Sequence, residues 1–348
     1  MTNSADVAAR GLPDLSLKVE DLTMHYLTRQ GEVKAVDGVS FELKRGEALG
    51  LVGESGCGKT SVAISLMKLL PDNARIIKGR VLLNGQDLLT MSDTEIRRFR
   101  WRRISMVFQA AMNALDPVYR VGDQIIEAIE NHGMAEDREH ARERVSQLFR
   151  LVGLAPQLMD RYPHEFSGGM RQRAIIAMAL ACEPDVIIAD EPTTALDVIV
   201  QDRILRELKA IQQDLNMSMI YITHDIAVVA EVTQQIGVMY AGKLVEVGST
   251  ADVFRSPVHP YTAALLSSFP SVKGEKHPLA TLPGEPPNLI EPPPGCRFHP
   301  RCPYATDICR RQEPPLEEHD GRWAACWNPL SGGPGYRPGQ TEGLNARI

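Results

Sequence analysis

Two segments near the start of the chain alternate apolar and polar residues. They run from Leu15 to Thr23 and from Val33 to Leu43, and Gly31 and Gly46 supply turns beside the second. A period of two is typical of a strand with one buried face. We therefore expect two short strands that form an antiparallel layer beside the rest of the fold.

Further segments are apolar runs with little alternation. They are Ala48 to Val52, Ile104 to Phe108, Val186 to Glu191 (which ends in two carboxylates) and Ser218 to Thr223. Short runs of this kind are typical of strands buried on both faces of a parallel sheet. Gly79 to Leu89 indicates another strand and turn, and Gln235 to Val247 indicates two apolar stretches joined by a turn at Gly242-Lys243.

The apolar spacing becomes helical in three places. These are Ser61 to Leu70, Asp123 to Gly153 and Ala174 to Ala181. Helices that alternate with buried strands predict an α/β domain. The stretch from about residue 110 to 175 then forms a helical insertion within that domain.

The segment between the first buried strand and the first helix carries a phosphate-binding motif. Gly53-Glu54-Ser55-Gly56-Cys57-Gly58-Lys59-Thr60 fits the pattern G-x-x-x-x-G-K-[ST] in the strand–loop–helix context that the motif requires. The glycines let backbone N–H groups surround phosphate oxygens, and the following helix directs its positive end at them. Lys59 can reach the terminal phosphates, and the Thr60 hydroxyl can bind Mg²⁺.

A second turn of the same kind, Ser167-Gly168-Gly169, opens the last of the three helices. Such a turn more often only starts a helix, but its free N–H groups can also bind an anion. Two carboxylates, Asp190 and Glu191, end a buried strand further on. Asp190 is the expected Mg²⁺ partner beside the phosphate-binding loop. Glu191 is placed to polarise a water that attacks the γ-phosphate.

Three more residues lie at the ends of predicted strands. Gln109 is either a strand cap or a side chain that reaches the metal. His224 follows the strand next in order after Asp190-Glu191, which favours contact with the γ-phosphate over a structural role. Tyr26 is either a strand-end aromatic or a ring that stacks on adenine.

Length and charge limit the class of protein. At 348 residues the chain holds one large domain with a smaller unit, or two domains, and its net charge of −6 provides no basic field for nucleic acid. Met1 to Pro13 contains no apolar core, so no secretory signal is expected. No stretch approaches the roughly 20 apolar residues that span a bilayer. We expect a soluble, cytoplasmic chain, for which docking on a membrane protein stays open.

The cysteines fall into two groups. Cys57 and Cys182 lie within the large domain and are expected to be small buried residues, whereas the other four are clustered near the C-terminus: Cys296, Cys302, Cys309 and Cys326. Four thiolates this close in sequence can bind a [4Fe–4S] cluster or a zinc ion. The absence of a Cys-x₂-Cys pair disfavours zinc, and a cytoplasmic location disfavours disulfides. Reduced thiols are the remaining alternative.

Together the motifs resemble an ABC-transporter ATPase. The segments that carry the resemblance are Gly53 to Thr60, Gln109, Ser167 to Gln172, Val186 to Glu191, Ala195 to Asp197 and His224. In order and spacing they are similar to the Walker A, Q-loop, signature, Walker B, D-loop and H-loop elements. Phe166 and Met170 stand where Leu and Gln are commonest in the family, but the serine and glycines that contact phosphate are present.

The C-terminal part narrows the resemblance. Ser256 to Leu266 is similar to the segment that ends the ATPase in oligopeptide and dipeptide importers, and the Pro-rich stretch Pro283 to Pro294 with the cysteines is similar to their C-terminal extension. The resemblance implies an ABC ATPase domain over residues 16–265, a small Pro/Cys-rich lobe over 266–330 and a flexible tail over 331–348. Some of these importers carry an iron–sulfur cluster at such cysteines, which favours a cluster here, with Zn²⁺ as the alternative.

The resemblance also assigns roles to individual residues. Glu191 is the general base, His224 contacts the γ-phosphate, and Gln109 completes the catalytic set. Mg²⁺ is bound, directly or through water, by Thr60, Gln109 and Asp190. ATP binding falls to Tyr26, Gly53, Ser55, Gly56, Cys57, Gly58, Lys59, Thr60, Ser61, Ser167, Gly168, Gly169 and Asp197.

In ABC ATPases each ATP lies between the Walker A loop of one domain and the signature of another. The resemblance therefore implies a second homologous ATPase subunit, usually a different chain in a heterodimer, together with two transmembrane permeases and an extracytoplasmic binding protein. The expected function is hydrolysis of ATP to ADP and phosphate that energises the import of short peptides at the cytoplasmic face of the inner membrane. Nickel complexes, haem and small oligosaccharides are alternative substrates of the same class. A soluble ABC ATPase without a membrane partner is the alternative of another class. An exporter subunit is a third possibility, but the resemblance of Ser256 to Leu266 and of the cysteines to importers favours import.

Overall fold

The computed structural model describes residues 14–109, 114–194, 196–268, 284–319 and 321–330. The expectations for Met1 to Pro13 and for a flexible tail over 331–348 lie outside the described residues. Within them, no helix is long and apolar enough to cross a membrane.

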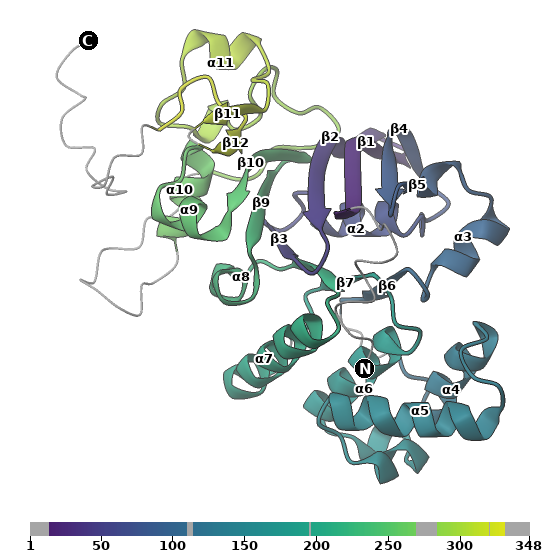
Figure 1. The fold of residues 1–348 in the computed structure, drawn as a ribbon. Coiled ribbons are helices and arrows are strands. Elements are labelled where there is room, and N and C mark those ends of the chain that lie inside the picture. The colour runs from purple at the N-terminus through teal and green to yellow at the C-terminus, as the bar shows by residue number, and fades with distance from the viewer. Residues whose placement is uncertain (1–13, 110–113, 195, 269–283, 320, 331–348) are drawn as a thin grey trace.

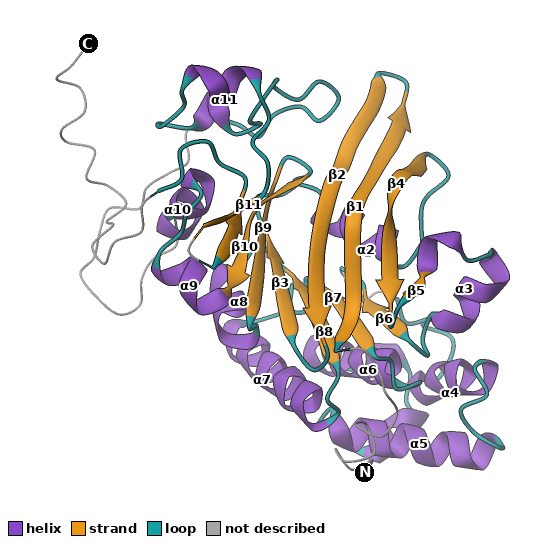
Figure 2. Ribbon diagram, turned by 45° about the horizontal axis from the view of Figure 1, so that its top comes forward, coloured by secondary structure: helices purple, strands orange, loops and turns teal. Residues whose placement is uncertain are grey.

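Four strands form an antiparallel sheet in the order β2-β1-β4-β5 (Figure 2). Their bounds are β1 Leu15–Thr28, β2 Gly31–Lys44, β4 Ala74–Leu83 and β5 Gln86–Asp87. The predicted antiparallel layer is confirmed, but β1 and β2 are 14 residues long rather than short. Several bulges absorb irregular positions in β1, so its pairing with β2 continues to a tight turn before Gly31.

A second, eight-stranded sheet has the order β11-β12-β10-β9-β3-β8-β7-β6. Its strands are β3 Ala48–Val52, β6 Ile104–Val107, β7 Val186–Asp190, β8 Ser218–Ile222, β9 Gln235–Tyr240, β10 Lys243–Ser249, β11 Glu317–His319 and β12 Arg322–Ala324. The five strands from β9 to β6 are parallel, and every residue of β3, β6, β7 and β8 is buried. The apolar runs are therefore the parallel core that the sequence predicts.

Ten α-helices are described. They are α2 Lys59–Leu66, α3 Asp93–Phe99, α4 Val121–Asn131, α5 Arg138–Leu151, α6 Gly168–Leu180, α7 Val198–Asp214, α8 Ile226–Val232, α9 Thr250–Arg255, α10 Pro260–Ser267 and α11 Asp307–Arg311. Helix α2 ends at Leu66, four residues before the predicted end, and Lys68 just beyond it adopts a positive φ of 50°. Short 3-10 turns are η1 Leu88–Thr90, η3 Pro156–Asp160, η4 Pro163–Glu165 and η5 His299–Arg301.

The elements pack around three apolar cores. One lies under α4 to α7, a second lies around α2 between the two sheets, and a third joins β9 and β10 to α10 and the C-terminal lobe, residues 284–330. Figures 1 and 2 place α4 and α5 at one end of the molecule and the C-terminal lobe, with α11, at the other. The loop between β3 and α2 lies between these ends and contacts both sheets.

Candidate nucleotide site

The loop after β3, residues 53–60 and hereafter the P-loop, depends on glycines in two different ways. A Cβ on Gly53 (φ +152°) would lie 2.1 Å from the Met239 carbonyl oxygen, and one on Gly58 (φ +105°) would lie 2.1 Å from the Ala35 carbonyl oxygen. A Cβ on Gly56 (φ +77°) would meet nothing within 4 Å. The loop is thus packed tightly at both ends and open in the middle, as a cradle for phosphate requires.

The Lys59 ammonium is held inside this loop. Its Nζ donates to the carbonyl oxygens of Gly53 at 2.7 Å and Glu54 at 3.0 Å, and it lies 3.6 Å from the Cys57 sulfur. Burial raises the pKa of the Cys57 thiol even though Lys59 lowers it. Cys57 is therefore a neutral, buried thiol, and Lys59 supplies the positive charge inside the loop.

Asp190 ends β7 as a buried carboxylate without a partner. It is 1% exposed, and neither of its oxygens has a hydrogen-bond partner among the described residues. Burial raises its pKa, while the nearby Thr60 hydroxyl lowers it without reaching hydrogen-bond geometry. An unpaired carboxylate and a hydroxyl beside a phosphate cradle are a donor set that fits Mg²⁺.

Glu191, the next residue, is hydrogen-bonded to both other predicted catalytic side chains, Gln109 and His224. Its carboxylate accepts hydrogen bonds from Gln109 Nε2 at 3.0 Å, Thr194 Oγ1 at 2.8 Å and His224 Nδ1 at 2.9 Å. Burial raises the pKa of Glu191, but the bonds from His224 and Thr194 outweigh it and hold the pKa below its usual range. Glu191 is thus ionised and oriented, as a general base must be.

Thr194 was not singled out by the sequence. A turn over residues 191–194 brings its side chain back to the Glu191 carboxylate. In this turn the Thr194 backbone N–H also donates to the Glu191 carbonyl oxygen at 3.2 Å. The positive φ of Glu191, 47°, makes this turn possible. The spacing Glu-x-x-Thr directly after a buried strand is the only sequence signal for it.

Tyr26 lies on β1 with its hydroxyl 3.2 Å from the Ser61 hydroxyl in the first turn of α2. The ring is half-buried beside the P-loop helix. Ser55, Gly56 and Thr60 are exposed on the open side of the loop. Tyr26 and the exposed P-loop residues therefore lie in the same part of the surface. Stacking of the Tyr26 ring on adenine stays a prediction.

The predicted signature residues lie apart from the P-loop. Ser167 caps α6 by accepting from Met170 N at 3.3 Å, and Asp197 caps α7 by accepting from Val200 N at 3.0 Å. Gly169 brings the two helices together, since a Cβ there would lie 2.8 Å from Val200. No hydrogen bond or ion pair between described residues joins Ser167, Gly168, Gly169 or Asp197 to residues 53–60. The predicted ATP contacts thus fall into two separate groups on one chain.

The four C-terminal cysteines line a single pocket. Burial raises the pKa of Cys302 to about 11 and that of Cys326 to about 12, and Asn328 approaches the sulfurs of Cys309 at 3.6 Å and Cys326 at 3.4 Å. The described residues nevertheless contain no group of three or more His, Cys, Asp or Glu side chains that could hold a metal ion. The structure confirms that the cysteines share a pocket, but it does not support the predicted iron–sulfur or zinc site.

Comparison with solved structures defines the class of protein. A dimeric, post-hydrolysis structure of the ATP-binding cassette MJ0796 bound to ADP and Pi matches with a TM-score of 0.61 and 26% identity, over 67% of this chain and 98% of that one. The structure of cbiO1 from Clostridium perfringens, part of the cbiONQ transporter complex, matches with a TM-score of 0.60 and 29% identity, over 70% and 91%. The fold is that of an ABC ATPase.

Sequence comparison is more specific. The ABC transporter family profile matches residues 36–194, and the profile of the oligopeptide/dipeptide transporter C-terminal region matches residues 245–309. A probable peptide ABC transporter ATP-binding protein of Sinorhizobium fredii is 47% identical over 90% of this chain and 95% of its own length. The oligopeptide transport ATP-binding protein OppD of Escherichia coli is 46% identical over 91% and 94%. The dipeptide transport protein DppD of Bacillus subtilis is 47% identical over 89% and 94%. The chain belongs to the family of ATP-binding subunits of oligopeptide and dipeptide ABC transporters.

Proposed function

We propose that this chain hydrolyses ATP to ADP and phosphate and thereby energises the import of short peptides. The observation that carries the proposal is the convergence of Gln109 and His224 on Glu191, directly beside the unpaired Asp190 and the P-loop. Relatives that match nearly their whole length are named as dipeptide or oligopeptide transport ATP-binding proteins. Nickel complexes, haem and small oligosaccharides are alternative cargoes of the same class.

Each residue near the P-loop has a role in this proposal. Backbone N–H groups of the P-loop and the Lys59 ammonium hold the phosphates, and Tyr26 covers the base. Asp190 and Thr60 hold Mg²⁺, with Gln109 reaching it directly or through water. Bound Mg²⁺ neutralises charge on the phosphate oxygens. Glu191 accepts the proton of the attacking water. The hydrogen bonds from His224 and Thr194 keep it ionised, and the bond from Gln109 helps to orient it.

The site is proposed to be completed by a second ATPase. Among the described residues, no hydrogen bond or ion pair joins Ser167, Gly168, Gly169 or Asp197 to this chain's own P-loop. We therefore assign them to the nucleotide of a partner. Val198 and Ile199, directly after Asp197, are 81% and 82% exposed, which favours an apolar contact there. The solved relative with ADP and Pi is a dimer. A heterodimer with a related chain is the arrangement we propose.

The permeases are proposed to dock next to Gln109. Phe108, Val118 and Tyr119 flank this segment and are 45%, 71% and 59% exposed, although large apolar side chains are normally buried. Movement of Gln109 as the site closes would pass directly to that surface. In this arrangement the chain is peripheral at the cytoplasmic face of the membrane, with two permeases and an extracytoplasmic binding protein.

A finer proposal concerns the four cysteines. We propose that they bind a [4Fe–4S] cluster, with Zn²⁺ as the alternative, because all four sulfurs line one pocket in a lobe with little apolar core of its own. Anaerobic purification followed by iron, sulfide and zinc analysis tests it. Brown protein with about four irons per chain is expected for the cluster, and protein free of both metals would refute both.

Transport itself is tested in membrane vesicles that contain this chain, its second ATPase and the two permeases. When binding protein and labelled dipeptide are supplied on one side of the membrane, the vesicles should transport the label only if ATP is present on the side that carries the ATPase subunits. Lys59→Ala should abolish uptake, since it removes the positive charge inside the P-loop. Equal uptake by the Lys59→Ala vesicles would contradict the proposal.

A further inference from the structure

The residue that follows the first P-loop glycine is held by the C-terminal part of the chain. The two terminal guanidinium nitrogens of Arg301 donate to the Glu54 carboxylate, at 2.7 Å and 3.0 Å. The Tyr261 hydroxyl accepts a 3.0 Å hydrogen bond from the Glu54 backbone N–H. Glu54 is thus fixed through its side chain and its backbone at once.

Glu54 in turn holds the P-loop lysine. Its carbonyl oxygen accepts from Lys59 Nζ at 3.0 Å, beside the 2.7 Å bond from the same nitrogen to Gly53. A displacement of Glu54 therefore moves one of the two oxygens that aim the ammonium. This path leads from Arg301 to the group that would contact the terminal phosphates.

The groups that hold Glu54 in place are buried. The Arg301 side chain is 6% exposed and also donates to the Tyr240 hydroxyl at 3.4 Å, and Tyr261 is fully buried. Tyr240, Tyr261 and Phe298 pack in tilted and edge-to-face pairs with ring centroids 4.6 to 5.4 Å apart, and the guanidinium carbon of Arg301 lies 5.8 Å from the centroid of the Tyr240 ring. A bidentate, charge-assisted pair in such surroundings fixes geometry better than a surface ion pair does.

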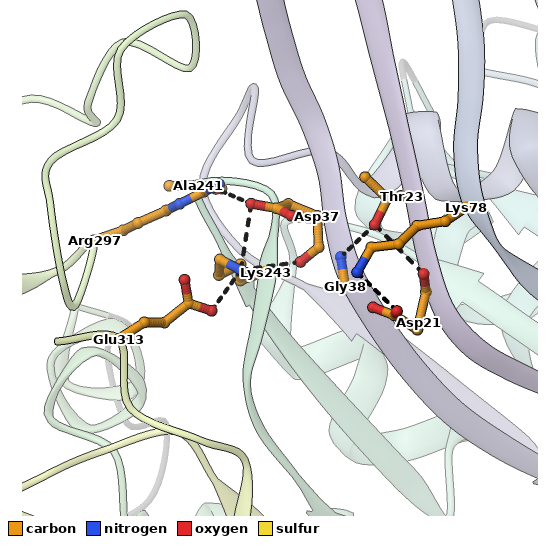
Figure 3. A network of polar contacts seen from close by, with 9 residues as sticks. All are labelled: Asp21, Thr23, Asp37, Gly38, Lys78, Ala241, Lys243, Arg297 and Glu313. Carbon is orange, nitrogen blue, oxygen red and sulfur yellow. Dashed lines mark hydrogen bonds and ion pairs between the residues drawn. The ribbon is translucent and has the colours of Figure 1, made fainter.

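A second arginine of the same segment anchors the lobe nearby. Arg297 donates to the Ala241 carbonyl oxygen and to Asp37, which also pairs with Lys243 (Figure 3). The adjacent Gly242 N–H donates to the Cys57 carbonyl oxygen of the P-loop at 2.8 Å. The segment 296–302 thus bonds to the P-loop directly through Arg301 and is linked to it indirectly through Arg297, Ala241 and Gly242.

We infer that Arg301, acting through Glu54, is a positioning residue that sets the affinity of the P-loop for Mg–ATP. The inference rests on the proposed ATPase function. It assigns to the C-terminal lobe a part in nucleotide binding in addition to any role of its cysteines. Because Arg301 acts on the loop through Glu54, we expect its effect on binding rather than on the hydrolytic step.

The test compares Arg301→Gln, Glu54→Gln and the double variant with the wild type in the full chain. Equilibrium binding of Mg–ATP is measured by calorimetry, and KM and kcat are measured in the assembled transporter. Loss of a charged, bidentate pair should weaken Mg–ATP binding and raise KM by about tenfold, with kcat unchanged. The double variant should bind no more weakly than either single one, because both remove the same interaction. Arg301→Lys, which restores one charged contact, should recover part of the affinity.

Arg322→Gln is the matched control. Arg322 is an equally buried arginine of the same lobe, but it donates to the carbonyl oxygens of Asp252 and Ser256 instead of the P-loop. It should lower thermal stability without changing Mg–ATP affinity. Equal loss of affinity in the Arg301 and Arg322 variants, or unchanged affinity in Arg301→Gln, would overturn the inference. A wild type that binds no Mg–ATP would instead overturn the proposed function.

Discussion

The Tyr261 hydroxyl lies 3.0 Å from the backbone nitrogen of Glu54, 207 positions earlier in the chain. Tyr261 lies in the segment Ser256 to Leu266, within the region that matches the oligopeptide/dipeptide transporter C-terminal profile, and this bond gives the segment a physical role. His259 caps α10 through its Nδ1, and burial lowers its pKa to about 3, so it stays neutral and the cap persists at any ordinary pH. The capped helix then presents Tyr261 to the P-loop.

Replacement of Tyr261 by Phe should weaken both the fold and the site. The change leaves the Glu54 N–H without its partner, which costs about 1–2 kcal/mol of unfolding free energy, and frees Glu54 to shift, which should raise the Kd for Mg–ATP severalfold. Chemical denaturation and calorimetry measure the two effects. Tyr221→Phe is the control, since that buried hydroxyl contacts only the Met219 sulfur among the described hydrogen bonds. Unchanged Mg–ATP affinity in Tyr261→Phe would contradict the role given to Tyr261.

Two P-loop glycines should respond to alanine in opposite ways. In Gly53→Ala the new methyl collides with the Met239 carbonyl oxygen, so the loss of stability should be about 3 kcal/mol or more. In Gly56→Ala the methyl enters open space, so stability should fall by only about 1–2 kcal/mol. That open space is the proposed phosphate cradle, and Gly56→Ala should therefore lose most Mg–ATP affinity while it remains folded. The measurements are chemical denaturation and Mg–ATP binding of both variants. Normal Mg–ATP binding by Gly56→Ala would contradict the role of Gly56 in the phosphate cradle.

Asp190→Asn should stabilise the nucleotide-free chain and abolish its response to Mg–ATP. The wild-type carboxylate is buried and unpaired, so neutralising it should gain about 1 kcal/mol. Thermal melting with and without Mg–ATP measures both effects. A variant that is less stable than wild type without ligand, or that keeps a Mg²⁺-dependent shift, would remove Asp190 from the proposed metal site.

The pH dependence of stability should also reveal the buried, unpaired carboxylate of Asp190. The pKa of Asp190 is raised on folding, so its protonation favours the folded chain. The resulting stabilisation is complete below the unfolded pKa of about 3.9 and is lost as the pH rises through the folded pKa. Asp190→Asn should remove this gain in stability at acid pH from melting curves recorded across that range. The Mg²⁺ affinity of the wild type should fall as the pH is lowered through the same range, because the carboxylate becomes protonated. A wild type and variant with parallel pH profiles would contradict the assignment.

His224→Ala should shift the acid limb of ATPase activity to higher pH. The His224 bond helps to hold the pKa of Glu191 below its usual range. Without it the pKa rises, the general base is protonated sooner on acidification, and activity is lost at a higher pH. The measurement is kcat against pH in the assembled transporter. His140→Ala removes a similar pairing, with Asp137 at the N-cap of α5, far from the P-loop in sequence, and should leave the limb in place. An identical shift in both variants would refute the explanation.

Much of the α/β core follows from the sequence because its signals are local. Four fully buried apolar runs become adjacent parallel strands, and their carboxyl ends necessarily lie on one edge of the sheet. This is why Gln109, Asp190 with Glu191, and His224 could be predicted to meet near the P-loop. The lengths of β1 and β2 could not be predicted, because bulges hide the alternation that a strand otherwise displays.

The contacts of the C-terminal lobe could not be predicted, because they are not local. Arg301 and Glu54 are 247 positions apart, and each alone is an ordinary charged residue. The cysteine pocket illustrates the opposite limit. Proximity in sequence predicted that the four sulfurs would be near one another, but no group able to hold a metal is found among the described residues. Ligand geometry depends on backbone detail that the spacing of cysteines does not determine.

Glu191 is proposed to be the general base of an ATP site that a partner subunit completes. The most direct test of this role is hydrolysis of bound ATP by Glu191→Gln in the assembled transporter. We expect that Mg–ATP still binds and that turnover falls by about 10²–10⁴-fold, with the two ATPase subunits held together by unhydrolysed ATP. Hydrolysis by Glu191→Gln at the wild-type rate would contradict this role.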